Sequence, residues 1–175
     1  MIDTSHLWLV PVTESSLIAL MADQPVQLAD MPITVPPEWA DLWVDHPGAL
    51  AYTLKSLQDN HDLHTLGWGG YFCVHRADKA LIGMGGFKGR PGTTGTVEIG
   101  YSIITPYRQQ GLATETARGL IQFAFSQPGV QQVMAHTLAV ENHSNRLLKS
   151  IGFHYNGLGD EPDEGEVWQW VLAKK

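Results

Sequence analysis

The chain has 175 residues, of which 43% are hydrophobic and 17% charged, enough to bury the core of a single domain spanning residues 1–175. A formal net charge of −7 disfavours binding to nucleic acid or to an anionic membrane, and mildly favours an amine as partner. The one cysteine, Cys73, excludes an internal disulfide and a thiolate zinc cluster. With no secretory leader and no long apolar run, we expect a soluble cytoplasmic protein.

The first third of the chain predicts one strand and three helices. Residues 6–12 form the strand, and residues 13–21 form a helix capped by Thr13. Residues 25–37 contain four prolines, which exclude regular helix and predict a long surface loop. Further helices are expected at residues 38–44 and 47–57.

A hairpin is predicted next, with strands at residues 69–76 and 80–88. The glycines at 83–86 suggest a dinucleotide fingerprint, but Lys88 takes the place of its last glycine and Pro91 follows where a helix should begin. A dinucleotide fold is therefore excluded.

Histidines and carboxylates gather at residues 59–64, where His61 and His64 are three residues apart. This spacing is weak evidence for a metal site without a second ligand pair elsewhere. We expect a solvated loop there and no metal in the protein.

The segment at residues 103–125 runs from a strand through a polar turn into an amphipathic helix. Residues 97–103 alternate apolar and polar, as a strand does, and Pro106 ends its ladder. Apolar residues recurring at helical spacing predict one buried helix face, which ends before Pro128; they are Ala113, Ala117, Leu120, Ile121 and Ala124.

The turn between them reads Arg108-Gln109-Gln110-Gly111-Leu112-Ala113. The start of a helix has free N–H groups and a positive partial charge, which suit a phosphate or diphosphate. Gly111 lets the backbone approach a ligand closely, and Arg108 adds a formal charge. An ordinary strand-turn-helix with a glycine in its turn is the alternative interpretation.

Arg-x-x-Gly-x-Ala at such a junction resembles the acetyl-CoA signature of the GNAT superfamily of N-acyltransferases. Residues 85–89, Gly-Gly-Phe-Lys-Gly, are similar to the branch near the ribosomal-protein (RimJ/RimL-like) acetyltransferases, as are His136-Thr137-Leu138, Asn142-x-Ser144 and Gly152-Phe153. These last motifs lie on a strand predicted at 130–138 and a helix at 142–151, before a final strand at 165–172. The chain departs from the superfamily twice: Asn142 lies one residue nearer to Gly152, and Leu148 stands where many members have a tyrosine.

The resemblance implies an α+β fold, with a mixed, mostly antiparallel sheet that splays between the strands at 97–103 and 130–138. Acetyl-CoA, as co-substrate, would lay its pantetheine arm in the gap, against the backbone of Ser102 and Ile104. Asn142 would anchor the arm from the other side. The diphosphate would lie on the amides of the turn, next to Arg108; they belong to Gln109, Gln110, Gly111, Leu112, Ala113 and Thr114.

The implied chemistry is acyl transfer to an amine. An alkyl amine is protonated at neutral pH, so a base must take its proton, and we expect Glu98 to do so. A structural ion pair with Lys or Arg is the alternative role for Glu98. A backbone N–H near Ile104 would stabilise the oxyanion. Leu148 cannot protonate the leaving thiolate, so Ser144, Tyr155 or solvent would do so.

The acceptor site is expected in residues 25–57. Trp39 and Trp43 lie four residues apart and, with Asp41 and Asp45, are candidates for contacting an amine; alternatively, the tryptophans pack on the core and the aspartates face water. Exposed tryptophans would also support a homodimer.

The sequence thus predicts an acetyl-CoA-dependent N-acetyltransferase that acts on a primary amine in a ternary complex. Ribosomal-protein N-termini, small amines and amine-bearing drugs all fit as acceptors. A CoA-binding sensor without turnover is one alternative function, and a protein-interaction domain indifferent to CoA is another.

Overall fold

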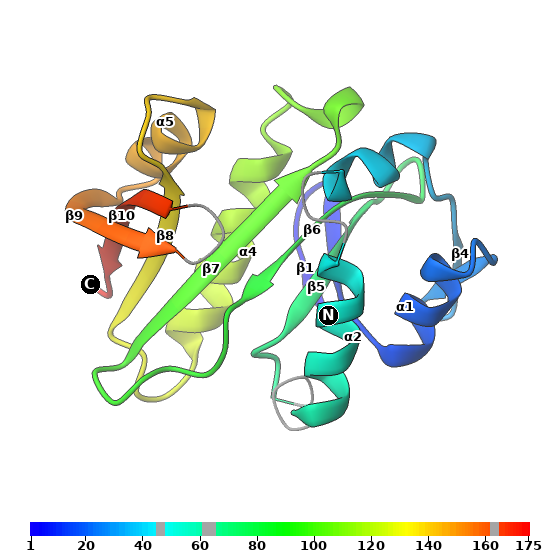
Figure 1. Ribbon diagram of the computed structural model, residues 1–175, viewed down its shortest axis with the longest axis horizontal. Coiled ribbons are helices and arrows are strands. Elements are labelled where there is room, and N and C mark those ends of the chain that lie inside the picture. The colour runs from blue at the N-terminus through cyan, green and yellow to red at the C-terminus, as the bar shows by residue number, and fades with distance from the viewer. Residues whose placement is uncertain (45–47, 61–65, 162–164) are drawn as a thin grey trace.

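The computed structural model describes residues 1–44, 48–60, 66–161 and 165–175. An eight-stranded sheet forms its centre, with the strands in the order β1-β2-β5-β6-β7-β8-β10-β9 (Figure 1). These strands are β1 (Ile2–Asp3), β2 (Leu7–Pro11), β5 (Gly70–His75), β6 (Ala80–Phe87), β7 (Thr96–Ile103), β8 (Gln132–Leu138), β9 (His154–Glu161) and β10 (Gly165–Ala173). The helices are α1 (Glu14–Met21), α2 (Ala49–Asp59), α4 (Leu112–Ser126) and α5 (His143–Ser150), with 3-10 turns η1 (Pro37–Trp43) and η2 (Thr105–Tyr107).

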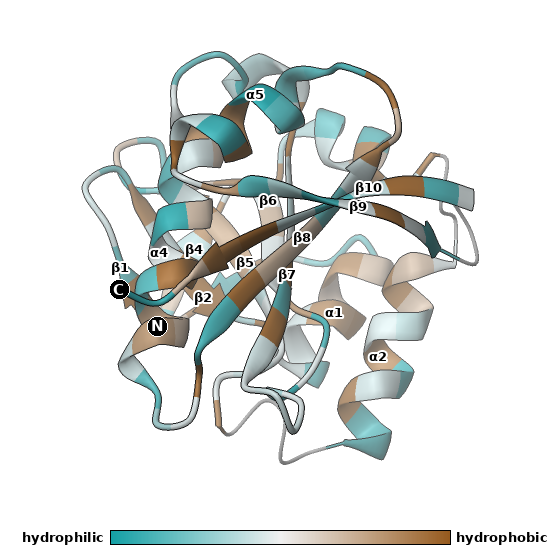
Figure 2. Ribbon diagram, turned by 90° about the vertical axis from the view of Figure 1, so that its left-hand side faces the viewer, coloured by the Kyte–Doolittle hydropathy of each residue, from teal (hydrophilic) through white to brown (hydrophobic). Residues whose placement is uncertain are grey.

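Helices cover both faces of the sheet (Figure 2). Helix α4 packs on β7 and β2, and its apolar side joins a core that includes Leu9, Ile99 and Leu120. Helices α1 and α2 and the turn η1 enclose a second core on the opposite face, around Phe72 and Leu81. Alternate residues of each strand feed the two cores, as the period of a strand requires.

All strand pairs in the sheet are antiparallel except β7 with β8. These two pair in parallel over only three residues, Thr96 to Glu98 against Gln132 to Met134. Beyond that point the strands diverge, as the green and gold strands of Figure 1 show. The predicted α+β fold with a sheet splayed between these two strands is confirmed.

Two predictions in the N-terminal part need correction. Residues 25–37 are not a surface loop, because they form a small hairpin of β3 (Val26–Leu28) and β4 (Met31–Ile33), whose Val26, Leu28 and Ile33 are buried. Pro32 is tolerated there because this two-stranded sheet consists of edges alone. The helix predicted at 47–57 is α2, which begins two residues later and ends two residues later. The segment with His61 and His64 lies mostly outside the described residues.

Candidate active site

The turn before α4 has the backbone conformation of a ligand-binding helix start. Gly111 is the N-cap with a left-handed φ of 81°, and no side chain caps the helix. The first helical bond joins the Glu115 N–H to the Gly111 carbonyl at 2.9 Å. The N–H groups of Leu112, Ala113 and Thr114 come before that bond and have no helical partner, which suits a diphosphate.

Arg108 is held at the end of β7. Its Nε donates to the carbonyl of Ile103 at 2.7 Å, which leaves the rest of the guanidinium beside the turn. The side chain of Gln110 instead bonds back to the carbonyl of Pro106 at 3.0 Å. Arg108 therefore supplies fixed positive charge next to the free amides.

These groups border a cleft of about 680 Å³ between β7, the start of α4 and α5. Most of the predicted cofactor residues line this cleft: Ser102, Arg108, Gln109 and the segment 111–114. Helix α5 contributes Ser144. Ile104 and Gln110 do not line the cleft. Its lining residues are Tyr101, Ser102, Ile103, Thr105, Arg108, Gln109, Gly111, Leu112, Ala113, Thr114, His143, Ser144 and Leu147.

The edge of β7 that faces the cleft carries the backbone groups of odd-numbered residues. The N–H of Ile104 donates to Ile82 on β6 at 2.8 Å, and the carbonyl of Glu98 accepts from Lys88 at 3.0 Å. Because direction alternates along an antiparallel ladder, Ser102 also points its backbone toward β6.

The predicted backbone contacts of Ser102 and Ile104 with the cofactor, and the oxyanion role of the Ile104 N–H, are therefore wrong. Strand β6 already uses these groups. The groups that point toward β8 and the splay belong to Ile99, Tyr101 and Ile103. The parallel register that pairs Glu98 with Met134 already uses the Ile99 N–H, and the Ile103 carbonyl is already bonded to Arg108. The error is one of register, because a period-two pattern does not say which edge of a strand each residue addresses.

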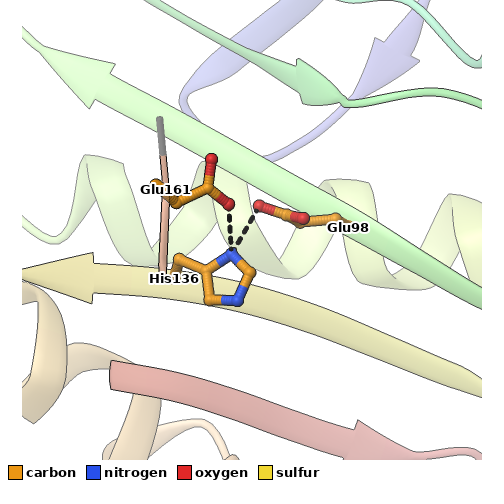
Figure 3. A group of neighbouring side chains, drawn as sticks. All are labelled: Glu98, His136 and Glu161. Carbon is orange, nitrogen blue, oxygen red and sulfur yellow. Dashed lines mark hydrogen bonds and ion pairs between the residues drawn. The ribbon is translucent and has the colours of Figure 1, made fainter. Parts of the chain in front are cut away.

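Glu98 lies where β7 and β8 separate, within a cluster of charged side chains (Figure 3). Its neighbours Val97 and Ile99 belong to the core under α4, so Glu98 projects from the opposite face of the sheet. Nδ1 of His136, on β8, lies 3.0 Å from Oε1 of Glu98 and 2.9 Å from Oε1 of Glu161. The two carboxylates and the imidazole are all largely buried.

Gln169 on β10 indicates which tautomer His136 adopts. The Gln169 Nε2 lies 3.3 Å from Nε2 of His136, so an amide donor there makes Nε2 the acceptor. The remaining proton of a neutral ring is then on Nδ1, which donates to the carboxylates of Glu98 and Glu161. His136 thus orients both carboxylates toward one point.

Lys88 places an ammonium at that same point. Its Nζ lies 2.6 Å from Oε1 of Glu98 and 3.1 Å from Oε1 of Glu161. Burial alone would lower the pKa of Lys88, but hydrogen bonds and the charges of Glu98 and Glu161 outweigh it and raise the pKa. The structural ion pair considered for Glu98 is therefore present.

The ligand atoms of Glu98, His136 and Glu161 lie within 4.8 Å of one another, a spacing that would admit a metal ion. The Lys88 ammonium already contacts both carboxylates, and a cation would have to displace it. The two carboxylates are therefore arranged around a primary amine, the ammonium group of Lys88.

Residues 6–154 match a family model described as an acetyltransferase (GNAT) domain. The chain belongs to the GNAT family. Two Bacillus subtilis (strain 168) proteins are similar to this GNAT chain. The uncharacterized N-acetyltransferase YjdG is 27% identical over 127 residues, which cover 73% of this chain and 71% of the relative. The uncharacterized N-acetyltransferase YoaA is 34% identical over 92 residues, 52% of this chain and 50% of the relative.

Solved structures share the same GNAT fold. RimL, a ribosomal L7/L12 alpha-N-protein acetyltransferase in complex with coenzyme A, has a TM-score of 0.73 at 17% identity, covering 98% of this chain and 97% of that one. A Salmonella typhimurium acetyl transferase that modifies the N-terminal serine of L7/L12 has a TM-score of 0.73 at 17% identity, covering 99% of both chains. The family model and the relatives together identify the protein as an N-acetyltransferase.

Helix α5 of this GNAT chain contributes less than the sequence predicted. The side chain of Asn142 caps it by accepting from the Asn145 N–H at 3.0 Å, and Asn142 does not line the cleft. Leu148 is 1% exposed and packs in the core, whereas Leu147 faces the cleft. Tyr155 lies away from the cleft, where its ring packs edge-on against Trp168 and Trp170.

The two tryptophans predicted to bind substrate pack together in the second core. Trp39 is 6% exposed and contacts Trp43 and Phe72 edge-to-face, with ring centroids 5.4 and 6.0 Å away. Asp41 faces solvent, and Asp45 lies outside the described residues. None of the chain's six tryptophans is exposed, so the premise for a tryptophan-mediated homodimer is wrong.

Sequence reasoning missed several residues of the site. Lys88 and His136 were read only as parts of family motifs, and Tyr101 only as an apolar position in a strand. Glu161 had no signal at all, because the glycine-rich β9 shows no clear alternation. Only pairing of β9 with β10 brings it to Glu98.

Proposed function

We propose that the protein transfers the acetyl group of acetyl-CoA to a primary amine by direct attack in a ternary complex. The observation that carries this proposal is the divergence of β7 from β8. It leaves an unpaired strand edge that leads from the free amides of α4 to the carboxylate cluster at Glu98.

The fit to coenzyme A rests on three features of this chain. The amides of Leu112, Ala113 and Thr114, with the Arg108 guanidinium, would hold the diphosphate. The carbonyl of Tyr101 and the N–H of Ile103, which point into the splay, would pair with the amides of the pantetheine arm, as a missing strand would. Bound there, acetyl-CoA supplies an activated thioester, and Ser144 and Leu147 of α5 border the cleft on its other side.

Glu98 would take the proton of the acceptor amine. A primary amine arrives as an ammonium, and two carboxylates with a fixed imidazole stabilise that ammonium, as their contacts with Lys88 illustrate. The acceptor would displace Lys88, whose side chain is 50% exposed and flexible. Transfer of one proton to Glu98 then frees the nitrogen lone pair for attack.

The N–H of Tyr101 replaces that of Ile104 as the candidate to stabilise negative charge on the thioester oxygen. This N–H points into the splay, where β8 has diverged from β7. Preorganised backbone donors of this kind are worth roughly 10²- to 10³-fold in kcat.

The acceptor class we propose is a protein N-terminus or a small primary amine. Two structural neighbours are described as enzymes that act on ribosomal protein L7/L12, one of them on its N-terminal serine. A single catalytic domain over residues 1–175, working in the cytoplasm, completes the proposal. Among the described residues, no helix has both the length and the apolar character needed to cross a bilayer.

A CoA-binding sensor is the second candidate, favoured by the absence of a phenol at Leu148. Transfer of isotope from labelled acetyl-CoA to a panel of amines separates the two functions. The panel should contain peptides with N-terminal serine, the same peptides with a blocked N-terminus as controls, and small amines. Label in any free amine supports the transferase; micromolar CoA binding with no transfer to any acceptor supports the sensor.

A further inference from the structure

Gly100 is a glycine of the central sheet that the packing of the fold does not require. Strands β5, β6 and β7 contain five glycines, and a Cβ added at four of them would come within 3.1 Å of a neighbouring atom: Gly70, Gly83, Gly85 and Gly86. A Cβ added at Gly100 would meet no atom within 4 Å. The backbone of Gly100 also lies outside the left-handed region that favours glycine. Neither packing nor backbone conformation therefore explains a glycine at this position.

A glycine at this place is unfavourable for the fold. Strand β7 is the fifth of eight strands, and a glycine inside a strand loses more backbone entropy than other residues and has no side chain to pack. Such a glycine often marks a place where a ligand approaches the backbone closely. Gly100 is exposed although its neighbour Ile99 is buried, so a ligand can reach the space above it.

Gly100 lies on the face of the sheet that carries the proposed base. Because side chains alternate along a strand, those of Glu98 and Ser102 project to the same face as position 100, about 7 Å to either side of it. On β6, Gly86 pairs with Gly100, so that strand places no side chain opposite it. The open space thus lies beside the Glu98 carboxylate.

The position of this space suits the acceptor better than the cofactor. The cleft proposed for coenzyme A is lined by Tyr101 and Ser102 but not by Gly100. The N–H proposed to stabilise the thioester oxygen belongs to the peptide bond between Gly100 and Tyr101, so the reacting carbon would lie next to Gly100. An amine held at Glu98 would approach that carbon from the face on which Gly100 lies.

The missing side chain at position 100 leaves room for a substituent on the carbon that bears the amine. A lysine side chain has a CH₂ group at that place, whereas the α-amino group of a peptide is attached to a carbon that bears a side chain. An α-amino group also has an ordinary pKa of about 7.7 to 8.0, against about 10.4 for lysine, so it gives up its proton to a carboxylate more readily. Both considerations favour a peptide α-amino group as the acceptor.

Resting on the proposed transferase function, we propose that Gly100 determines acceptor specificity. The first side chain of an acceptor peptide lies over the backbone of Gly100, while the α-amino group is held at Glu98. The site therefore takes α-amino groups of residues larger than glycine, and a side chain at position 100 excludes them.

Gly100→Ala tests this proposal with peptides that differ only in their first residue. The wild-type protein should acetylate peptides that begin with serine or alanine at least as well as one that begins with glycine. In Gly100→Ala, kcat/KM for the serine and alanine peptides should fall by at least about 10-fold, the size of one misplaced methyl group, whereas the glycine peptide should stay within about 2-fold. Gly100→Val should lower kcat/KM for the serine and alanine peptides further.

Two other readouts separate this role from a structural one. The melting temperature of Gly100→Ala should rise by about 1 to 4 °C, because alanine fits without strain and restricts the unfolded chain. The affinity for acetyl-CoA should be unchanged. Gly92→Ala, in the turn before β7, is the matched control, since its Cβ would meet no atom closer than 3.9 Å. It should leave kcat/KM for every peptide unchanged.

A lower melting temperature in Gly100→Ala would show that the fold needs this glycine, and a weaker affinity for acetyl-CoA would assign the space to the cofactor. Either result would overturn the proposal, as would an equal effect on all peptides or no effect on any. Transfer by the wild type to unbranched small amines but to no peptide would overturn this inference alone. Transfer to no amine at all would overturn the proposed function as well.

Discussion

Glu98 forms the ion pair that the sequence presented as one alternative, and we propose that it also acts as the base, which was the other. Its Oε1 is paired with Lys88 and His136, yet the same contacts fix the carboxylate beside the splay where an amine must arrive. A carboxylate that is held by flexible Lys88 can exchange that ammonium for another. The structural ion pair and the proposed base are thus compatible.

Replacing Glu98 by Gln should lower kcat by roughly 10²- to 10⁴-fold at neutral pH, since the amide cannot accept the proton. The affinity for acetyl-CoA should stay within error of the wild type, because Glu98 projects from the face opposite α4. Steady-state kinetics and calorimetry on one preparation check both expectations. Intact turnover would remove Glu98 as the base.

Lys88→Met should lower the KM for the amine acceptor by about 2- to 5-fold, because the acceptor no longer competes with a half-exposed ion pair worth up to about 1 kcal/mol. Lys79→Met, at the opposite end of β6, serves as the control and should leave KM unchanged. A higher KM for Lys88→Met would mean that Lys88 helps to bind the acceptor instead of standing in its place.

At the scale of elements, the periodicity of the sequence located almost every strand and helix around the site. The strand at 97–103 and the helix start at Gly111 were predicted from alternation and turn chemistry, and β7 and α4 confirm both. The alternation did not identify which backbone groups of β7 would be hydrogen-bonded to β6, because the choice of edge depends on the pairing partner. The hairpin at β3 and β4 was missed because proline content outweighed three buried apolar residues.

Helix α4 is also tied to the N-terminal strands through Glu115. Its carboxylate accepts hydrogen bonds from the Thr4 hydroxyl and the His6 backbone N–H, both at 2.6 Å. Burial alone would raise the pKa of Glu115, but these bonds and the His6 ring lower it below 4.5. Because the pKa of Glu115 is lower in the folded protein than in the unfolded chain, its carboxylate adds to the free energy of unfolding at pH values above the unfolded-state pKa. That contribution is lost as the pH falls through the lowered, folded-state pKa.

Glu115→Ala should therefore lower the free energy of unfolding by about 2 kcal/mol at pH 7. The difference from the wild type should narrow below about pH 4.5, where the wild-type carboxylate takes up its proton. Urea unfolding of both proteins at several pH values measures this difference in the free energy of unfolding. A difference that stays constant down to pH 3 would show that packing, and not the charge, stabilises this junction.

For the molecule as a whole, the sheet consists of two parts joined along the three paired residues of β7 and β8. Strands β1, β2, β5, β6 and β7 form one antiparallel part, and β8, β10 and β9 form the other. The family resemblance predicted this division. It did not predict that β9 would bring the Glu161 carboxylate within 4.8 Å of Glu98. Strand β9 reaches this place only through its pairing with β10, and the pairing of β10 with β8.

The proposed function depends on the binding of acetyl-CoA by the free amides after Gly111. Gly111 and Gly129 lie near opposite ends of α4 with φ of 81° and 82°, and a Cβ added at either would meet no atom within 4 Å. Valine at either position should therefore cost similar backbone strain, of roughly 1 to 2 kcal/mol.

The decisive measurement is calorimetric titration of acetyl-CoA into the wild type, Gly111→Val and Gly129→Val, each verified as folded. We expect affinity to fall by at least about 10-fold, or 1.4 kcal/mol, in Gly111→Val and to stay unchanged in Gly129→Val. Equal affinity in all three folded proteins would contradict the account.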